Sequence, residues 1–445
     1  MPVAREIAYD LTRRVNSSGA YLSLLLQYTM QDDALSSRDR AMVAELAYGV
    51  QRHRNKMDYI IEKFSSRPLS EIEDEVLDVL RLGVYQISEM RIPPHASVNE
   101  TVDLSKEKLH PGAASFVNAV LRNTVKGIAD LQWPSRNKLP YYLEIIFSHP
   151  RWLVDYILDM LDATSAEALC VADNQFQGIS LRINPAKTDR ESLMNRIVSG
   201  GGRAEVSHHF EEALVKVGLP RRLLLDLLEA GDCVVQDESS MLVGHVVDPQ
   251  PGSIVVDACA APGGKTSHLA ILGGESCRVI AIDRNSRRLD ALCKTVKRLG
   301  LANIEVVEGD SAKLGDYLSL APDAILVDAP CSGLGTLRRR PELKWRRTRE
   351  DLRRLAETQL ALLDGCAEVL RPGGVMVYSV CTYTLEETTE VMASFLAKRP
   401  DYVLDDVSPY LPHEMKASAG SAGHIQLMPH LHDTEGMFVA RLKRT

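Results

Sequence analysis

The stretch SIVVDACAAPGGKT, residues 253–266, decides the fold of the C-terminal half of the chain. Its apolar beginning, residues 253–258, is typical of a strand that is buried on both faces. Small residues follow, and they allow the backbone to turn tightly and to approach a ligand. The helix that begins next offers free N–H groups at its N-terminus. A strand, a small-residue turn and a helix in this order predict one repeat of an α/β fold.

Similar apolar runs recur downstream, with helical stretches between them, at residues 278–283, 304–309, 323–330 and 374–380. This alternation predicts a Rossmann-like α/β fold, in which helices cover both sides of a parallel sheet. Ligands of such a sheet bind at the carboxyl ends of its strands. We therefore expect the functional residues directly after these runs.

The chain has 445 residues, which is too long for a single hydrophobic core. Near its N-terminus, apolar residues such as Val117, Val120 and Leu121 recur at helical spacing, and no run there predicts a strand. A stretch with two prolines, residues 131–140, predicts a linker. We predict an all-α domain, a small α/β connecting module and the sheet domain, over residues 1–135, 145–235 and 236–445.

Composition and charge limit the class of protein. The formal net charge of -8 argues against a protein that coats nucleic acid without specificity. The eight cysteines form no CxxC pair and no cluster with zinc-ligand spacing, so we expect reduced thiols, no metal and a cytoplasmic location. No apolar run is long enough for a signal peptide or a membrane span. A monomer is the default expectation.

The turn at residues 257–266 is compatible with either of two nucleoside cofactors. A phosphate-binding loop is excluded, because Cys259 stands where that motif requires a glycine. Asp283 ends the next apolar run, and an acidic residue about 20 residues beyond the turn binds the ribose of nicotinamide dinucleotides. The same acidic residue suits S-adenosylmethionine, so these residues leave the choice between the two cofactors open.

Two cysteines stand where the sheet is expected to bind its ligands. Cys331 follows one apolar run in DAPCSGLGT, three residues after Asp328, and Cys381 follows another in VYSVCT. Because the carboxyl ends of parallel strands meet at one edge, both thiols are expected to converge there. Elsewhere a lone cysteine is usually a small buried apolar residue. We expect that role for Cys170, Cys233, Cys277, Cys293 and Cys366.

A basic run follows the first of these cysteines. LRRRPELKWRRTREDLRR, residues 337–354, has nine basic and three acidic residues, a net charge of +6 in an acidic protein. Its tryptophan is able to stack on a base. We expect an RNA-binding surface made by Arg338, Arg339, Arg340, Lys344, Trp345, Arg346 and Arg347.

With these motifs in place, the chain resembles the RsmB (Sun/Fmu) family of bacterial small-subunit ribosomal RNA cytosine-5 methyltransferases, part of the wider Nop/Sun family. ASFVNAVLRN (114–123) is similar to the signature of a NusB-like RNA-binding domain, and SHPRWLVDYI (148–157) is similar to the motif at the family's domain junction. VQDESS, DACAAPGGKT, DAPCSGLGT, RRRPELKW and VYSVCTYTLEE follow in the family's order. The closing QLMPHLHDTEGMFVARL is expected to form a hairpin.

The resemblance implies a class I methyltransferase sheet and a function. The enzyme would transfer a methyl group from S-adenosylmethionine to carbon 5 of a cytosine in small-subunit (16S) ribosomal RNA. Asp283 would bind the ribose, Asp310 the adenine, and Asp328 would lie beside both the methyl donor and the cytosine. The methionine moiety would lie against Cys259, Ala260, Ala261, Pro262, Gly263, Gly264 and Lys265.

The resemblance also implies how the two thiols divide the work. Cys381 would be the nucleophile and Cys331 would assist product release. Carbon 5 of cytosine becomes reactive when a thiolate adds to carbon 6, and a base must later remove the carbon 5 proton. A thiolate needs a nearby cation, for which Lys265 is the candidate. The family's usual threonine before the nucleophile is Val380 here, a minor departure.

Two other functions remain as alternatives. In one, the chain is a non-enzymatic RNA-binding or ribosome-assembly factor, against which the paired cysteines and three cofactor carboxylates argue. In the other it is an NAD-dependent enzyme, which leaves Cys331 and Cys381 without a role. A cofactor-binding titration separates these two from the methyltransferase.

Overall fold

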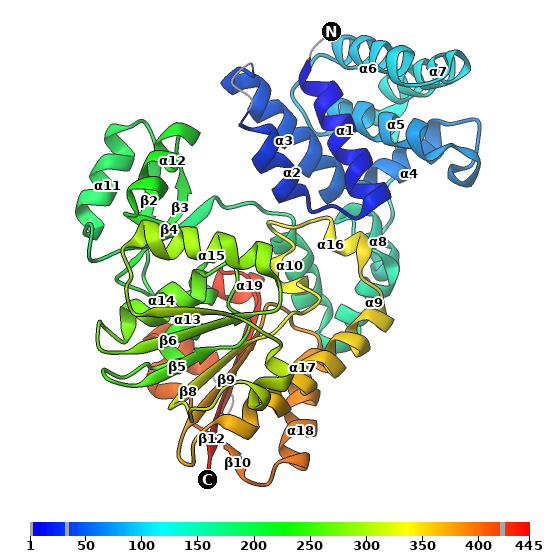
Figure 1. Ribbon diagram of the computed structural model, residues 1–445. Coiled ribbons are helices and arrows are strands. Elements are labelled where there is room, and N and C mark those ends of the chain that lie inside the picture. Colours follow the sequence, from blue (N-terminus) through cyan, green and yellow to red (C-terminus); the bar gives the residue numbers. More distant parts are fainter. Residues whose placement is uncertain (1–2, 32–34, 419–422) are drawn as a thin grey trace. The chain divides into compact units, whose positions relative to one another are not determined.

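The computed structural model describes residues 3–31, 35–418 and 423–445. Its contacts divide the chain into two compact units (Figure 1). One contains residues 1–175 together with 337–347, and the other contains residues 176–336 and 348–445. The units therefore follow different boundaries from the three predicted domains. Within the described part of the chain, no helix is long and apolar enough to cross a membrane.

The first unit is all-α, as predicted. Its described helices are α1 (Val3–Ser18), α2 (Leu22–Thr29), α3 (Ser37–Arg52), α4 (Arg54–Phe64), α5 (Asp74–Ser88), α6 (Pro94–Lys108), α7 (Pro111–Gly127), α8 (Leu139–Ile146), α9 (Arg151–Met160), α10 (Ala163–Asp173) and the short α16 (Leu343–Arg346). The predicted stripe of Val117, Val120 and Leu121 lies in α7 and is fully buried. It packs in one core with apolar residues of α4 and α5.

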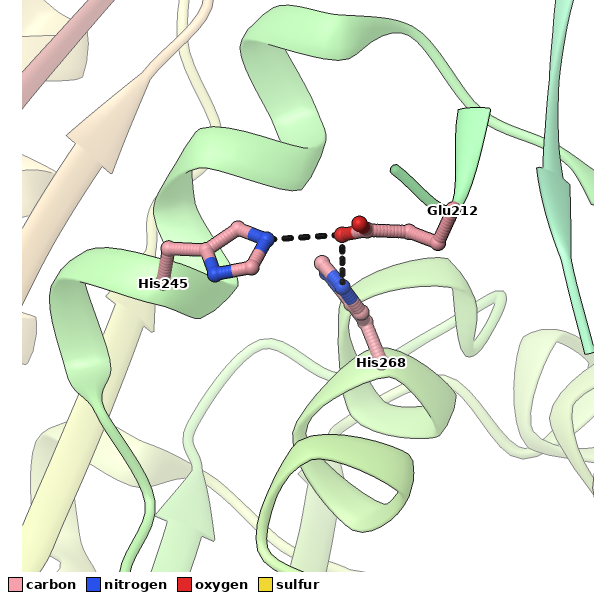
Figure 2. A group of neighbouring side chains, drawn as sticks. All are labelled: Glu212, His245 and His268. Carbon is pink, nitrogen blue, oxygen red and sulfur yellow. Dashed lines mark hydrogen bonds and ion pairs between the residues drawn. The ribbon is translucent and has the colours of Figure 1, made fainter. Parts of the chain in front are cut away.

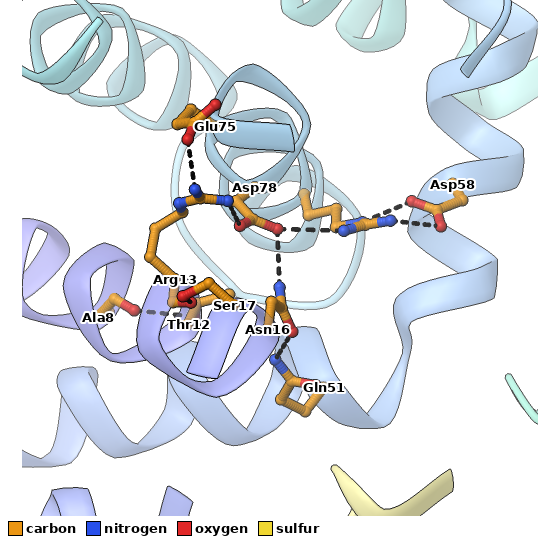
Figure 3. Close-up of polar contacts among 10 residues, drawn as sticks. Ala8, Thr12, Arg13, Asn16, Ser17, Gln51, Asp58, Glu75 and Asp78 are labelled. Atoms are coloured by element: carbon orange, nitrogen blue, oxygen red, sulfur yellow. Dashed lines mark hydrogen bonds and ion pairs between the residues drawn. The ribbon is translucent and has the colours of Figure 1, made fainter. Parts of the chain in front are cut away.

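A polar network ties helices of this unit together. Asp78 of α5 is 1% exposed, and a buried carboxylate is costly unless it is paired. It accepts hydrogen bonds from Arg13 at 3.1 Å, Asn16 at 2.8 Å and Arg81 at 3.1 Å (Figure 3). Arg81 also donates to Asp58 of α4 at 2.6 Å. These contacts fix α1 and α4 against α5.

The second unit begins with a small antiparallel sheet. Its strands are β1 (Ile179–Ile183), β2 (Arg203–Val206), β3 (Ala213–Gly218) and β4 (Cys233–Val235), in the order β2-β3-β1-β4. Helices α11 (Arg190–Ser199) and α12 (Arg221–Ala230) contribute apolar residues to the same core. This arrangement confirms a small α/β module before the larger sheet.

The larger sheet has the order β10-β12-β9-β8-β5-β6-β7, and β11 pairs with β12. Five strands are parallel: β5 (Ile254–Asp257), β6 (Arg278–Asp283), β7 (Ile304–Glu308), β8 (Ala324–Asp328) and β9 (Val375–Val380). The others, β10 (Tyr402–Leu404), β11 (His424–Leu427) and β12 (Met437–Arg444), are antiparallel to their neighbours. The Rossmann-like sheet is thus confirmed with a mixed edge, and β11 and β12 form the predicted closing hairpin.

Alternating residues of the parallel strands face two different cores, as the period of a strand requires. On one face, Val256 and Ile325 pack in a core with residues of α17 (Arg349–Val369) and α18 (Thr389–Lys398). On the other, Val255 and Leu326 pack with α13 (Glu238–Val247) and α14 (Gly264–Leu272). Helices therefore cover both faces (Figure 1).

The strand order reverses at the centre of this sheet. From β5 the chain runs to β6 and β7 on one side, through α15 (Ser286–Leu299), and then returns to β8 and β9 on the other side. Such a reversal opens a crevice outside the carboxyl ends of the two central strands, where α/β proteins bind ligands. One of the remaining cysteines differs from expectation, because Cys293 of α15 is exposed. The other four are buried.

Candidate active site

The predicted cofactor and catalytic residues follow the parallel strands at one edge of the sheet. Asp283 ends β6, Asp328 ends β8, and Cys381 directly follows β9. Asp310 comes two residues after β7, and Cys331 lies in the loop after β8. The parallel strands thus bring residues from four strand ends to the same edge of the sheet.

In the turn after β5, the backbone lies close against the side chain of Leu292 in α15. Gly263 has φ of +101°, a conformation that favours glycine, and an added Cβ would lie 3.0 Å from the side chain of Leu292. The Ala261 N–H donates to Asp283 Oδ2 at 3.2 Å. Asp283 is 5% exposed, and its other oxygen accepts from the Asn285 N–H at 2.9 Å. Asp283 therefore holds the turn in place.

Asp310 lies at the open end of β7. Its side chain is exposed and accepts a hydrogen bond from the Ala312 N–H at 3.1 Å. This contact fixes the carboxylate at the start of the short helix that follows the strand.

A lysine and an aspartate form the charged centre of the site. Lys265 Nζ donates to Asp328 Oδ2 at 2.8 Å, and Ser379 Oγ donates to Asp328 Oδ1 at 2.8 Å. Burial acts to lower the pKa of Lys265, but the Asp328 carboxylate outweighs it, with a smaller contribution from Cys381, so the pKa lies above its ordinary value. Lys265 is therefore an ammonium ion that favours negative charge on both Asp328 and Cys381.

The two thiols meet as predicted from their strand-end positions. Cys331 Sγ and Cys381 Sγ lie 3.2 Å apart. The hydrogen bond to Cys381 and burial together raise the pKa of Cys331 well above its ordinary value. Cys331 thus keeps its proton, and Cys381 is the sulfur that lies within the influence of the Lys265 ammonium.

The sequence analysis gave no role to Glu387, which holds the loop of Cys331 through a hydrogen bond with the neighbouring Ser332. Its side chain is buried, and burial raises its pKa above the ordinary value. Glu387 Oε1 accepts from the Ser332 N–H at 2.7 Å and from Gln359 Nε2 at 3.1 Å, while Oε2 accepts from Thr384 Oγ1 at 2.8 Å. The glutamates of the TLEE stretch were visible in the sequence, but nothing there indicated that one of them faces inward.

Asp257 was likewise not predicted as a functional residue. It ends β5, is fully buried, and accepts from Thr266 Oγ1 at 2.7 Å. Burial raises its pKa to about 7, and the nearby Asp328 carboxylate adds to the shift. This aspartate ties the strand to the first turn of α14, the helix that carries Lys265.

The boundary between the two units divides the basic run. Residues 337–347 belong to the first unit, where Trp345 Nε1 donates to the Gln51 carbonyl at 2.7 Å and Arg338 Nε donates to the Ala172 carbonyl at 2.9 Å. Lys344 is fully buried and donates to the Ser148 carbonyl at 3.1 Å. The burial of Lys344 contradicts its predicted contact with RNA.

The other basic residues of this run differ in exposure. Arg340 is exposed, and Arg339, Arg346 and Arg347 are partly exposed. The Arg346 guanidinium also lies over the ring of Tyr21, 5.1 Å from its centroid. Arg349, Arg353 and Arg354, later in the run, are exposed as well.

Comparison with known proteins identifies the family. Over 98% of its length the chain is 31% identical to the ribosomal RNA small subunit methyltransferase B of Pectobacterium atrosepticum, covering 98% of that protein. A protein from Bacillus subtilis described as a probable ribosomal RNA small subunit methyltransferase B is 33% identical, with 99% of this chain and 98% of the relative covered. The chain belongs to this family of ribosomal RNA methyltransferases.

Family models match the domains of the RsmB/F methyltransferases one after another. The NusB family model matches residues 2–126, a ferredoxin-like domain of RsmF/B-like methyltransferases matches residues 149–216, and the 16S rRNA methyltransferase RsmB/F model matches residues 244–443. Solved structures share the fold. PH0851 has a TM-score of 0.84 and 24% identity, covering 100% of this chain and 99% of its own. NSun6 from Pyrococcus horikoshii has a TM-score of 0.59 at 24% identity, over 66% and 98% of the two chains.

Proposed function

We propose that this family member transfers a methyl group from S-adenosylmethionine to carbon 5 of one cytosine in 16S ribosomal RNA, through a covalent bond between Cys381 and the base. The observation that carries the proposal is the pair of sulfurs 3.2 Å apart beside the Lys265–Asp328 ion pair. A nicotinamide enzyme would have no use for two adjacent thiols. Modification of a pyrimidine ring needs a thiol nucleophile, a cation and a base together.

The residues at the strand ends fit S-adenosylmethionine. Nothing in the described part of the chain, apart from the residues next to Gly264, lies within 4 Å of a Cβ added at this glycine, which leaves room for a ligand against the backbone. Asp283 and Asp310 offer carboxylate acceptors for hydroxyl and amino groups, and Asp328 offers negative charge for a sulfonium. S-Adenosylmethionine bound there supplies the electrophilic methyl group. The chain's own residues make the carbon of the base able to accept it.

Cys381 acts first. Its thiolate adds to carbon 6 of the cytosine, so that an Sγ–C6 bond forms and the electrons of the C5–C6 double bond shift toward the ring nitrogen. The Lys265–Asp328 pair supplies a proton to that nitrogen and balances the charge. Carbon 5 is then electron-rich and becomes the methylated atom.

Cys331 acts last. While Cys381 is free, the hydrogen bond between the two sulfurs keeps the Cys331 pKa high. Once Cys381 Sγ is bonded to carbon 6 it accepts this bond less well, so Cys331 loses its proton more readily. Cys331 gives its own proton to solvent, and its thiolate then removes the proton from carbon 5. The C5–C6 double bond re-forms, the Sγ–C6 bond breaks with its electrons returning to Cys381, and the ring nitrogen gives its added proton back to the Lys265–Asp328 pair.

The experiment is methyl transfer from labelled S-adenosylmethionine to unmodified 16S ribosomal RNA, comparing the native protein with Cys381→Ala. We expect label as 5-methylcytosine in the native reaction alone. Label at another position of the base, or equal label with Cys381→Ala, would overturn the proposal. A parallel titration of cofactor binding by both proteins shows whether an inactive variant still holds the methyl donor.

A further inference from the structure

A second cluster of ionisable side chains lies in the same unit, away from the strand ends. Glu212 precedes β3 of the small sheet, His245 lies on α13 and His268 lies on α14 (Figure 2). Glu212 Oε1 is 2.7 Å from His245 Nε2 and 3.2 Å from His268 Nε2. One ligand atom from each residue lies within 4.8 Å of the others. Three elements therefore direct one carboxylate oxygen and two imidazole nitrogens to a single point.

The rings of both histidines are held in place by their surroundings. The ring of Phe210 stacks on that of His245, with centroids 5.1 Å apart and an interplanar angle of 11°. An added Cβ at Gly244 would lie 2.5 Å from His268 Nδ1, so the ring fits closely against α13 only because residue 244 is glycine. Packing on these sides leaves Nε2 of each ring directed toward Glu212 (Figure 2). Such preorganisation is what a metal site requires of its supporting residues.

We propose that Glu212, His245 and His268 bind a divalent transition-metal ion of the Zn²⁺ class. Two imidazoles and one carboxylate are a ligand set that Zn²⁺ uses in proteins, with solvent completing its coordination. Glu212 and His245 have side chains 23% and 29% exposed, so an ion and its water ligand can reach the site. Binding needs the proton on Nε2 of each ring to move to Nδ1 and the ligand atoms to separate from their hydrogen-bond distances, after which the ion takes the place of the two hydrogen bonds.

Two features set a limit on the affinity. The described residues offer His268 Nδ1 no hydrogen-bond acceptor, whereas metal-binding histidines almost always have one. The buried Arg182, which donates to Ser267 Oγ at 2.7 Å, carries a positive charge that lowers the pKa of His268 and repels a cation. We therefore expect weaker binding than at a closed structural zinc site with four protein ligands.

The position of the cluster gives the ion a structural consequence. His268 lies one turn after Lys265 on α14, the helix that starts at the cofactor turn. Glu212 directly precedes β3 of the small sheet. An ion bound between them would fasten this sheet to the helix that carries a catalytic side chain. The sequence predicted no metal because its ligands lack a short spacing, since Glu212 lies 33 residues from His245 and 56 from His268.

The test is a Zn²⁺ titration of the full chain after treatment with a chelator, with Glu212→Gln and His245→Ala beside the native protein. His95→Ala, at an exposed histidine of the first unit, is the matched control. A Cys331→Ser/Cys381→Ser protein removes the thiol pair, which is itself able to bind Zn²⁺. Circular dichroism confirms that each variant is folded before titration.

In the thiol-free background, in which each variant is also made, we expect one Zn²⁺ site that His95→Ala leaves unchanged. Loss of a ligand should weaken Zn²⁺ binding by roughly 10–100-fold or more, since loss of a residue that only supports a ligand already has an effect of this size. Zn²⁺ should raise the Tm of the thiol-free protein and leave that of its Glu212→Gln variant unchanged, because only the folded state holds the site. Co²⁺ in the thiol-free protein should give a spectrum of nitrogen and oxygen ligands. Unchanged affinity in Glu212→Gln and His245→Ala, or no site in the thiol-free protein, would overturn the proposal.

Discussion

Lys265 Nζ and Asp328 Oδ2 lie 2.8 Å apart, although 63 residues separate them in the chain. The contact joins the first turn of α14 to the end of β8, across the point where the strand order reverses. The Lys265 ammonium interacts electrostatically with both the Asp328 carboxylate and Cys381. In the proposed mechanism, this arrangement of charges favours the binding of a sulfonium and the formation of a thiolate.

Replacement of Lys265 by methionine should therefore slow methyl transfer more than it weakens cofactor binding. The variant keeps the length of the side chain but loses the ammonium that supports the thiolate, and we expect kcat to fall about 100-fold or more. Single-turnover kinetics with saturating S-adenosylmethionine measure this directly. A native rate in the Lys265→Met protein would remove the ion pair from the mechanism.

Glu387→Gln tests the support of the Cys331 loop. In the native protein, the two carboxylate oxygens of Glu387 accept from the Ser332 N–H and from the Thr384 hydroxyl. Glutamine keeps an acceptor oxygen for Ser332, but its NH₂ group cannot accept the hydrogen bond from Thr384. Leaving a buried partner unsatisfied costs about 1–3 kcal/mol of stability. We expect a lower Tm and slower product release with unchanged cofactor affinity, and a loss of cofactor affinity equal to the loss of rate would contradict this role.

Exposed residues of the basic run should contribute to RNA binding, and buried residues should not. Arg340→Ala is expected to lower the slope of log affinity against log salt by about 0.7, the value for one phosphate contact on single-stranded nucleic acid. Lys344→Met should leave this slope unchanged and lower the Tm instead, because the buried ammonium donates to the Ser148 carbonyl and Asn174 Oδ1. Equal changes of slope in both variants would show that Lys344 reaches RNA after all.

Asp257 should make the stability of the native protein depend on pH. Its pKa is raised to about 7 in the folded state, so the folded protein holds this proton at pH values where the unfolded chain has lost it. The contribution of Asp257 to the free energy of unfolding therefore falls as pH rises from about 4 to about 7, and stays level above that. Replacing Asp257 with a residue that cannot ionise should remove this pH dependence of the free energy of unfolding.

Asp257→Asn keeps an acceptor for Thr266 and cannot ionise. Buried histidines such as His268 have lowered pKa values and change stability in the opposite direction over part of this range. The difference between native and Asp257→Asn unfolding free energies, measured by denaturant titration at several pH values, isolates the aspartate. A difference that does not change between pH 4 and pH 7 would show that Asp257 is ionised in the folded state.

The strand-end residues were predictable because parallel strands force their carboxyl ends to one edge. Apolar runs located the strands, and Asp283, Asp328, Cys331 and Cys381 follow them at once. The residues that the sequence did not indicate depend on contacts between distant segments. Glu387 reaches back to Ser332, and Glu212 meets two histidines on other elements. No local sequence pattern predicts contacts between segments that lie so far apart in the chain.

The basic run shows a different limit of sequence reasoning. A cluster of charges predicts an exposed surface, because burying a charge is costly. Lys344 overcomes this cost with carbonyl acceptors of the first unit and a pKa that burial lowers to about 7. The predicted roles of the individual catalytic residues stay predictions until they are measured.

The most direct test of the central proposal is the fate of the RNA on Cys331→Ala. This variant keeps the nucleophile and loses the thiol that removes the carbon 5 proton, so a covalent protein–RNA complex should accumulate when S-adenosylmethionine and unmodified 16S ribosomal RNA are present. Denaturing gel electrophoresis and mass spectrometry should detect the complex and locate the bond at Cys381, and Cys331→Ala/Cys381→Ala should form none. A bond at another residue, or free methylated RNA with no complex, would contradict the account.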